Sequence, residues 1–256
     1  MNRLPWPRSA LIACGAFALL ALLLLVWPSG RPADPFADPA RFQAAVGQAL
    51  RANPEIIVEA LQNMQQRQGQ MEQMRARQAV AANRVALEQD GNSAVGGNPR
   101  GDVTLVEFYD YRCSYCRQAH ATVSELLRSD PNLRLVYKEF PILGPESMIA
   151  ARAAVAARSS SYYTAFHDAL MTARGPLTEE SVLKIAGSVG INVSALQVDM
   201  RNPDIDEIIA ANHALARELG INGTPAFVIG DTLLPGVVEL SELKQLIADQ
   251  RALRAR

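Results

Sequence analysis

Cysteine is scarce in this chain, and neither sign of charge predominates. The 256 residues include only three cysteines, and 25 basic side chains nearly balance 26 acidic ones, for a net charge of −1. This balance provides no extended basic field, so nucleic acid is not an expected partner. Exported domains that are stabilised by disulfide bonds usually carry more cysteines than this chain has, and their cysteines are more widely spaced. The sequence therefore excludes a disulfide framework as the basis of its stability.

One long hydrophobic run lies near the N-terminus. Residues 9–27 carry no charge and are rich in alanine and leucine, at close to the ~20 residues that cross a bilayer. Arg3 and Arg8 precede the run, which predicts a cytoplasmic N-terminus and export of everything that follows. We interpret residues 1–30 as a cytoplasmic tip and uncleaved signal anchor, with a cleaved signal peptide as the alternative. A lipoprotein signal at Cys14 is a third interpretation, although most of the apolar run follows that cysteine.

Export makes the remaining cysteines informative. Cys113 and Cys116 are the only cysteines beyond the hydrophobic run, and they are three residues apart. In an oxidising compartment, a lone C-x-x-C pair is typical of thiols that exchange disulfides rather than of a structural bridge.

Residues 36–90 are predicted to form a helical stalk, interrupted at Asn53-Pro54. Its second helix carries a seam at alternating spacings of four and three, formed by Ile57, Leu61, Met64, Gln68 and Met71. About two heptads of such a seam cannot be buried by one helix alone in water. The helix packs on its own domain or on copies of itself, and we favour self-association. Residues 91–101, with four glycines and a proline, are predicted to be a linker.

The segment from Val103 to His120 is predicted to be a buried strand, a short turn and a helix. Val103 to Tyr109 is almost continuously apolar, β-branched and aromatic, as in a strand covered on both faces. Beyond Cys116, apolar residues recur at helical spacing, at Ala119, Val123, Leu126 and Leu127. Cys113 therefore lies at or near a helix N-terminus, where unpaired N–H groups and the helix dipole favour a thiolate anion.

Residues 102–256 are predicted to form one α/β domain. A second strand covers Leu133 to Lys138, and a block of helices follows at about residues 145–220. A hairpin of Ala226 to Ile229 and Thr232 to Leu234 precedes a last amphipathic helix. The order is strand, helix, strand, helical block, hairpin and helix.

This order resembles the thioredoxin fold in its DsbA-like form, with a helical insertion before the hairpin. Three features carry the resemblance: the C-x-x-C that opens a helix after an apolar strand, Glu107 six residues before Cys113, and Thr224-Pro225 before a strand. Residues 53–62, followed by Gly-Asn-Pro before the strand, resemble the N-terminal region of ScsC-like bacterial relatives. Some such proteins assemble through this stalk into trimers that act as disulfide isomerases.

The resemblance implies a role for each residue of the motif. Cys113 would attack a substrate disulfide or receive electrons through a mixed disulfide, and Cys116 would resolve it. Glu107 would be a buried proton acceptor for Cys116, although a partly exposed acid at a strand end is the alternative. Pro225 would be cis rather than an ordinary trans turn proline, which would leave the Thr224 backbone free to pair with an extended substrate. Lys138, on the neighbouring strand, is a candidate partner for Glu107.

Ser114 and Tyr115 lie between the cysteines and are expected to tune the exchange. They offer backbone N–H groups and a hydroxyl but no imidazole, so a milder oxidant than the Pro-His relatives is expected. With a self-associating stalk, isomerase or reductase activity is favoured over primary oxidation.

The expected setting is the bacterial periplasm, with the inner membrane as anchor or with a cleaved signal. The expected partners are exported proteins that bear thiols or disulfides, a membrane redox partner, and further copies of the chain, most simply as a trimer. No cofactor and no metal is expected.

The rival interpretation is a metal-handling or chaperone module. In it, Cys113 and Cys116 bind Cu(I), and Met64, Met71 and Met74 assist. A zinc site through C-x-x-C-x-x-x-H would include His120, but no usual fourth ligand is evident. His120 is therefore interpreted as a packed or surface histidine, and His167 and His213 lie in predicted helices without an identifiable partner.

Overall fold

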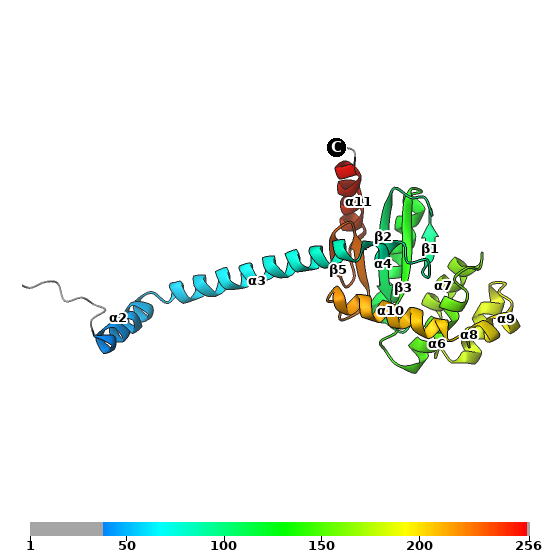
Figure 1. Cartoon of the computed structure of the whole chain (residues 1–256), viewed down its shortest axis with the longest axis horizontal. Coiled ribbons are helices and arrows are strands. Elements are labelled where there is room, and N and C mark those ends of the chain that lie inside the picture. The colour runs from blue at the N-terminus through cyan, green and yellow to red at the C-terminus, as the bar shows by residue number, and fades with distance from the viewer. Residues whose placement is uncertain (1–37, 255–256) are drawn as a thin grey trace, which may run out of the picture. The chain divides into compact units, whose positions relative to one another are not determined.

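The computed structural model describes residues 38–254 (Figure 1). The chain separates into two compact units, Met1–Gln66 and Arg67–Arg256. The proposed membrane segment at residues 9–27 lies outside the described residues. Within residues 38–254, no helix combines the length and the hydrophobicity that crossing a membrane requires.

The first unit contains α2 (Pro39–Ala52) and the beginning of α3 (Glu55–Ala82). Asp38 caps α2, because its carboxylate accepts from the N–H groups of Ala40 and Arg41, and Pro39 occupies the first turn. No residue of α2 is buried, and the only buried residue of α3 is Val80, which belongs to the second unit. The apolar seam predicted from the sequence is therefore exposed to solvent within this chain.

The second unit is built on a five-stranded sheet with the order β1-β3-β2-β4-β5. The strands are β1 (Ala94–Gly97), β2 (Val103–Tyr109), β3 (Leu133–Glu139), β4 (Ala226–Ile229) and β5 (Thr232–Pro235). β2 pairs in parallel with β3, while the pairs β1–β3, β2–β4 and β4–β5 are antiparallel. β2 thus lies at the centre of the sheet.

Every residue of β2 is buried, because helices cover both faces of the sheet. Side chains alternate between the faces of a strand. Leu105 and Tyr109 join a core with α5 (Ser114–Ser129) and α11 (Leu240–Arg254), whereas Val106 and Phe108 join a second core with α4 (Arg84–Glu88) and α10 (Asp204–Glu218). Glu107 shares the alternation of Leu105 and Tyr109, so its strand position is on the face that α5 covers.

The helical insertion follows β3, as predicted. It comprises α6 (Pro145–Ala156), α7 (Tyr163–Thr172), α8 (Glu179–Ser188), α9 (Val193–Asp199) and then α10. Figure 1 shows α6 to α9 gathered on one side of the strands. The Thr178 side chain accepts from the Ser181 N–H at 3.2 Å and so caps α8.

The boundary between stalk and domain differs from the prediction. Residues 91–101, expected to be a linker, contain β1, whose residues pair with Arg134 to Tyr137 of β3. The end of the predicted stalk also packs on the sheet, since Val80 and Leu87 are buried in the core with Val106 and Phe108. The second unit therefore begins well before Asp102, because burying this face of the sheet requires the end of α3 and α4.

Candidate active site

The turn after β2 places Cys113 at the start of α5. The Cys113 N–H donates to the Asp110 carbonyl at 3.0 Å, and the Cys113 carbonyl accepts from the Arg117 N–H at 3.1 Å. Cys113 is the N-cap residue, with extended backbone angles of φ −75° and ψ 118°. The predicted position of this thiol at the positive end of a helix is thus present in the structure.

Both cysteines are largely shielded from solvent, and only Cys113 keeps some exposure. Both are free thiols; Cys113 is 7% exposed and Cys116 is 0% exposed. The Cys113 Sγ donates to the Thr224 carbonyl at 3.3 Å. The Thr224–Pro225 peptide bond is cis, as the family resemblance implied. Residues more than a hundred positions apart are therefore brought together around the dithiol.

The segment before β4 also borders a hollow of about 350 Å³. Its walls include Gly223, Thr224, Pro225 and Leu233. Ser114 and Tyr115, between the cysteines, are exposed, and Tyr115 is among the exposed large side chains of the domain. This end of the domain therefore offers an accessible surface beside a nearly buried thiol.

Glu107 is a buried carboxylic acid in the middle of the sheet. It is 2% exposed, and its Oε1 has no hydrogen-bond partner among the described residues. Burial raises the pKa of Glu107 to about 8, because the charged form has lost its hydration. The alternative of a partly exposed strand-end acid is therefore wrong.

Lys138 is not the partner of Glu107. In the strand register Glu107 lies opposite Tyr137, and Lys138 lies opposite Phe108. The Lys138 ammonium instead donates to the Asp90 carboxylate at 2.8 Å and to the Ala86 carbonyl at 2.7 Å. The physical reason is strand alternation, which directs side chains at neighbouring positions to opposite faces.

Cys116 needs a base if it is to act as a nucleophile. Desolvation by burial raises the pKa of its thiol far above the ordinary value, and a charged Glu107 would raise it further. A neutral thiol in such a place reacts only when a neighbouring group takes its proton. Glu107, with an unused oxygen and a pKa near neutrality, has the properties of that group.

Asp110 organises the turn, and the sequence interpretation missed it. One carboxylate oxygen accepts from the Arg112 N–H at 2.7 Å and the Ser147 hydroxyl at 2.8 Å. The other accepts from the N–H groups of Ile142 and Leu143 at 2.8 and 3.0 Å. This buried carboxylate therefore joins the cysteine turn to the start of α6. An acid directly after a buried strand is the only signal in the sequence, and it does not reveal the three partners from residues 142–147.

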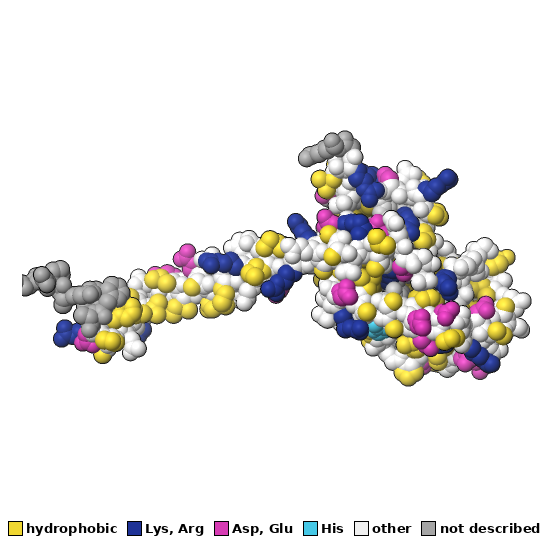
Figure 2. Space-filling model, in the orientation of Figure 1, with side chains coloured by type: hydrophobic (Ala, Val, Ile, Leu, Met, Phe, Trp, Pro, Cys, Tyr) yellow, Lys and Arg dark blue, Asp and Glu magenta, His cyan; other side chains and the backbone are white. Residues whose placement is uncertain are grey.

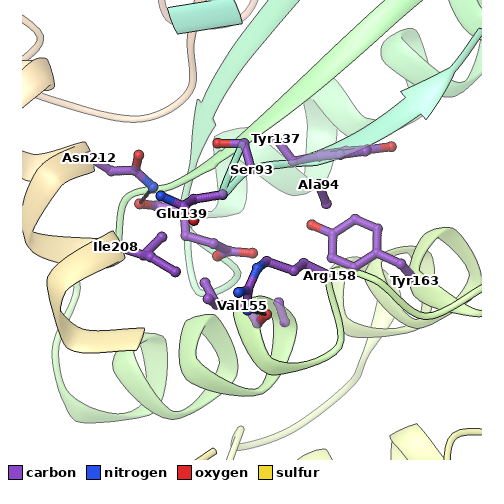
Figure 3. A pocket seen from close by; sticks show the side chains of 11 residues that line it. Ser93, Ala94, Tyr137, Glu139, Val155, Arg158, Tyr163, Ile208 and Asn212 are labelled. Atoms are coloured by element: carbon purple, nitrogen blue, oxygen red, sulfur yellow. Dashed lines mark hydrogen bonds between the residues drawn. The ribbon is translucent and has the colours of Figure 1, made fainter. Parts of the chain in front are cut away.

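A second buried acid, Glu139, lies at the end of β3. Its Oε1 accepts from the hydroxyls of Tyr109 and Tyr111, and the Tyr109 hydroxyl also lies 3.1 Å from that of Tyr163. Burial again raises the pKa of this carboxyl well above the usual range. Figure 3 shows Glu139 and Tyr163 on the wall of a cavity of about 10 Å³, near the smallest space that holds one water molecule.

The histidines have partners that the sequence did not reveal. His213 packs on the ring of Phe140, with ring centroids 4.7 Å apart. His120 of α5 lies 3.4 Å from the Asp168 carboxylate, and its ring is tilted by 60° to that of His167 of α7. The contact between α5 and α7, which brings His120 to His167 and Asp168, cannot be derived from sequence spacing alone.

Comparison with known proteins gives two family matches. Residues 104–248 match the model of the DSBA-like thioredoxin domain, and residues 38–70 match that of the copper resistance protein ScsC N-terminal domain. The second match ends close to the boundary between the two compact units. The two matches thus correspond to the two parts of the described chain.

Solved structures show the same likeness. A thioredoxin-like oxidoreductase from Silicibacter pomeroyi DSS-3 is 52% identical, covering 66% of this chain and 98% of its own, with a TM-score of 0.64. Proteus mirabilis ScsC in a transitional conformation is 30% identical, covering 83% of this chain and 96% of its own, with a TM-score of 0.63. At 83% of this chain, the second likeness extends beyond the sheet domain.

A curated relative covers the chain less completely. The Na(+)/H(+) antiporter NhaA of Herminiimonas arsenicoxydans is 32% identical over 145 residues, which are 56% of this chain and 23% of the antiporter. This chain therefore spans less than a quarter of that relative's length.

Proposed function

The chain belongs to the DSBA-like thioredoxin-domain family of thiol–disulfide oxidoreductases, and from this premise we propose that it is an exported disulfide isomerase or reductase. The observation that carries the proposal is the asymmetry of the dithiol. Cys113 lies at a helix N-terminus and donates to the carbonyl of Thr224, which borders an accessible hollow, while Cys116 is fully buried. One thiol meets substrates, and the other is protected from them.

The exchange proceeds in two displacements. The Cys113 thiolate attacks one sulfur of a substrate disulfide, forms a mixed disulfide and releases the other substrate sulfur as a thiolate. Cys116 then loses its proton and attacks the Cys113 sulfur, which forms the Cys113–Cys116 disulfide and releases the second substrate thiolate. The substrate gains two electrons and the enzyme loses two. In isomerisation, a different substrate thiol attacks the mixed disulfide first and returns Cys113 to the reduced state.

Glu107 takes the proton from Cys116 in this scheme. Its raised pKa, near 8, keeps it close to the point at which it can both accept and release a proton at neutral pH. The Thr224 carbonyl, which accepts from Cys113 in the free protein, would pair with the backbone of an extended substrate lying in the adjoining hollow. Pro225 and the exposed Ser114 and Tyr115 would border that chain.

The residues between the cysteines support a mild oxidant. Neither Ser114 nor Tyr115 supplies a cationic ring that would stabilise the Cys113 thiolate. We expect a reduction potential more negative than the ~−120 mV of strongly oxidising DsbA. Equilibration with glutathione redox buffers measures it, and a value at or above ~−120 mV would remove this support for isomerase or reductase activity.

The stalk supports self-association. Ile57, Leu61 and Met64 lie on one seam and are 46%, 50% and 50% exposed. Figure 2 shows hydrophobic side chains along the surface of α3. A seam of this kind is buried when copies of the helix pack together, and three copies would hold three dithiols around one substrate. We propose a homotrimer in the periplasm that exchanges electrons with a membrane redox partner. It is tethered to the inner membrane if residues 1–30 remain as a signal anchor, and released if they are cleaved as a signal peptide.

Trapping tests the chemistry most simply. Cys116→Ser cannot resolve the first intermediate, so it should accumulate mixed disulfides with exported proteins that reducing agent releases. Cys113→Ser, as the matched control, should trap little, because Cys116 is buried. Equal trapping by the two variants, or none by either, contradicts the assignment of Cys113 as the attacking thiol. The rival Cu(I) carrier predicts loss of metal affinity in both variants and no trapped proteins.

Substitutions in the seam test assembly. Ile57→Ser with Leu61→Ser should reduce the mass in light scattering from an oligomer to a monomer and should lower isomerase activity on a scrambled substrate. Gln62→Ser with Gln66→Ser alters the same helix outside the seam and should leave both properties unchanged. If the unaltered protein is already monomeric, the isomerase proposal loses its basis in assembly.

A further inference from the structure

A cluster of metal-ligating side chains lies between α5 and α7. His120 of α5 and His167 and Asp168 of α7 each offer a ligand atom, and the three atoms lie within 4.8 Å of one another. The His120 Nε2 is 3.4 Å from the Asp168 Oδ1, and the two imidazole rings are 5.4 Å apart between centroids. Within residues 38–254 this is the only such group of histidine, cysteine and acidic residues.

Hydrogen bonding prepares one nitrogen of His167 for a ligand. The side chain is 1% exposed, and its Nδ1 lies 3.1 Å from the Tyr111 hydroxyl. Tyr111 already donates its proton to Glu139, so its oxygen accepts from the His167 Nδ1–H. The lone pair is then on Nε2, for which the described part of the chain supplies no hydrogen-bond partner. A buried histidine that donates through one nitrogen and keeps the other free has the arrangement of a metal ligand held by a second residue.

We propose that His120, His167 and Asp168 bind a divalent transition-metal ion, for which Zn²⁺ is the probe of choice. Two imidazoles and one carboxylate match the nitrogen and oxygen ligands of zinc and leave a fourth position for water. The three ligand atoms, which lie within 4.8 Å of one another, must come closer together to form a tetrahedral site with bonds of about 2.0–2.2 Å. Half of the Asp168 side chain is exposed, which gives the ion a route from solvent.

The proposed metal site shares no residue with the dithiol. His120 follows Cys116 by one helical turn on α5, and the two other ligands come from the insertion. An ion held there links the helix that carries the reactive cysteines to the insertion that the thioredoxin core lacks. Its binding therefore requires neither cysteine, and this separates the inference from the proposed exchange activity.

The test uses the full exported chain with the Cys113–Cys116 disulfide formed, so that no thiolate is available to the metal. Calorimetric titration with Zn²⁺ should show one site per chain. Co²⁺ should give the visible absorption of a tetrahedral ion with nitrogen and oxygen ligands. His120→Asn and Asp168→Asn should each weaken Zn²⁺ binding at least tenfold. His213→Asn removes the remaining histidine of the chain, on α10, and should leave the affinity unchanged.

Circular dichroism checks that each variant is folded, and His120→Gln and Asp168→Glu provide second substitutions at the two ligands that are less buried than His167. Absence of saturable binding to the oxidised protein overturns the proposal. So does equal binding by His120→Asn, by Asp168→Asn and by the unaltered chain, or loss of binding in His213→Asn. Binding only to the reduced protein would assign the ion to the cysteines and would equally overturn it.

Discussion

Glu107 and Glu139 occupy neighbouring central strands of one sheet, and burial raises the pKa of each, yet their surroundings are opposite. Glu139 accepts from two tyrosine hydroxyls, and a third tyrosine extends the network. Glu107 leaves one carboxyl oxygen without a partner among the described residues. Native proteins rarely leave buried polar atoms unsatisfied, and the exceptions call for an explanation.

The difference separates a structural acid from a reactive one. The tyrosines hold Glu139 in place and connect β2, β3 and α7, which fixes the insertion on the sheet. Glu107 has fewer hydrogen bonds that would fix its state of protonation. It lies on the face of β2 that is covered by the helix carrying the cysteines. We therefore expect substitutions at these two positions to act on different properties.

The largest expected effect is on the pH dependence of stability. A Glu107 pKa of about 8, raised from an ordinary 4.5, means that the folded protein holds a proton that the unfolded chain releases. The penalty is absent below pH ~4.5, grows as pH rises and is complete above pH ~8, where it reaches up to about 5 kcal/mol. Glu107→Gln lacks this penalty.

Urea unfolding of the unaltered chain and of Glu107→Gln, from pH 4.5 to pH 9, measures this pH-dependent loss of stability. The stability of Glu107→Gln relative to the unaltered chain should rise across this range. A constant difference would mean that Glu107 is not buried as a neutral acid. Glu139 is present in both proteins, so its own titration is common to them.

A matched pair of substitutions at Glu107 and Glu139 separates their contributions to stability. At pH 4.5, where protonation of the two acids contributes little, Glu139→Leu removes the acceptor of two buried hydroxyls and should cost about 2–4 kcal/mol. Glu107→Leu strands no donor among the described residues and should change stability by less than about 1 kcal/mol. Chemical denaturation at this pH compares them, and equal losses at the two sites would end the distinction between the two acids.

The smallest effect should come from the edge of the Glu139 network. Tyr163→Phe removes one hydroxyl, seen in Figure 3, and should cost about 1 kcal/mol. Its rate of disulfide exchange should be that of the unaltered protein, because the network holds the insertion rather than the dithiol. A change in exchange rate without a change in stability would instead connect Tyr163 to the chemistry.

The sequence was sufficient to predict the catalytic strand and the cysteine helix. Both depend on short-range patterns: an unbroken apolar run for a doubly covered strand, and helical spacing that begins at the cysteines. Such patterns did not predict β1, which has four residues, two of them glycines. Its pairing with β3 is a tertiary contact, and a Cβ at Gly96 would lie 2.8 Å from the Tyr137 ring. The glycines that suggested a linker therefore allow a close approach instead.

Long-range polar contacts were the other limit of the sequence. The resemblance to a family indicated Glu107 and Pro225, whereas Asp110 and Glu139 were marked only by their positions at strand ends, which reveal neither their burial nor their partners. Asp110 accepts hydrogen bonds from Ser147, Ile142 and Leu143, and Glu139 accepts one from Tyr109. Each of these partners is 30 or more residues away along the sequence. Burial of these groups follows from how the insertion packs, which periodicity does not report.

If Glu107 serves as the base for Cys116, it controls the rate at which Cys116 resolves a mixed disulfide. A disulfide formed between Cys113 and a fluorescent peptide thiol would be mixed into buffers from pH 6 to pH 10, and release of the peptide followed. We expect a step in rate near pH 8 for the unaltered protein, and a rate roughly 10- to 100-fold lower without that step for Glu107→Gln. The same rate and the same pH profile in both proteins would contradict it.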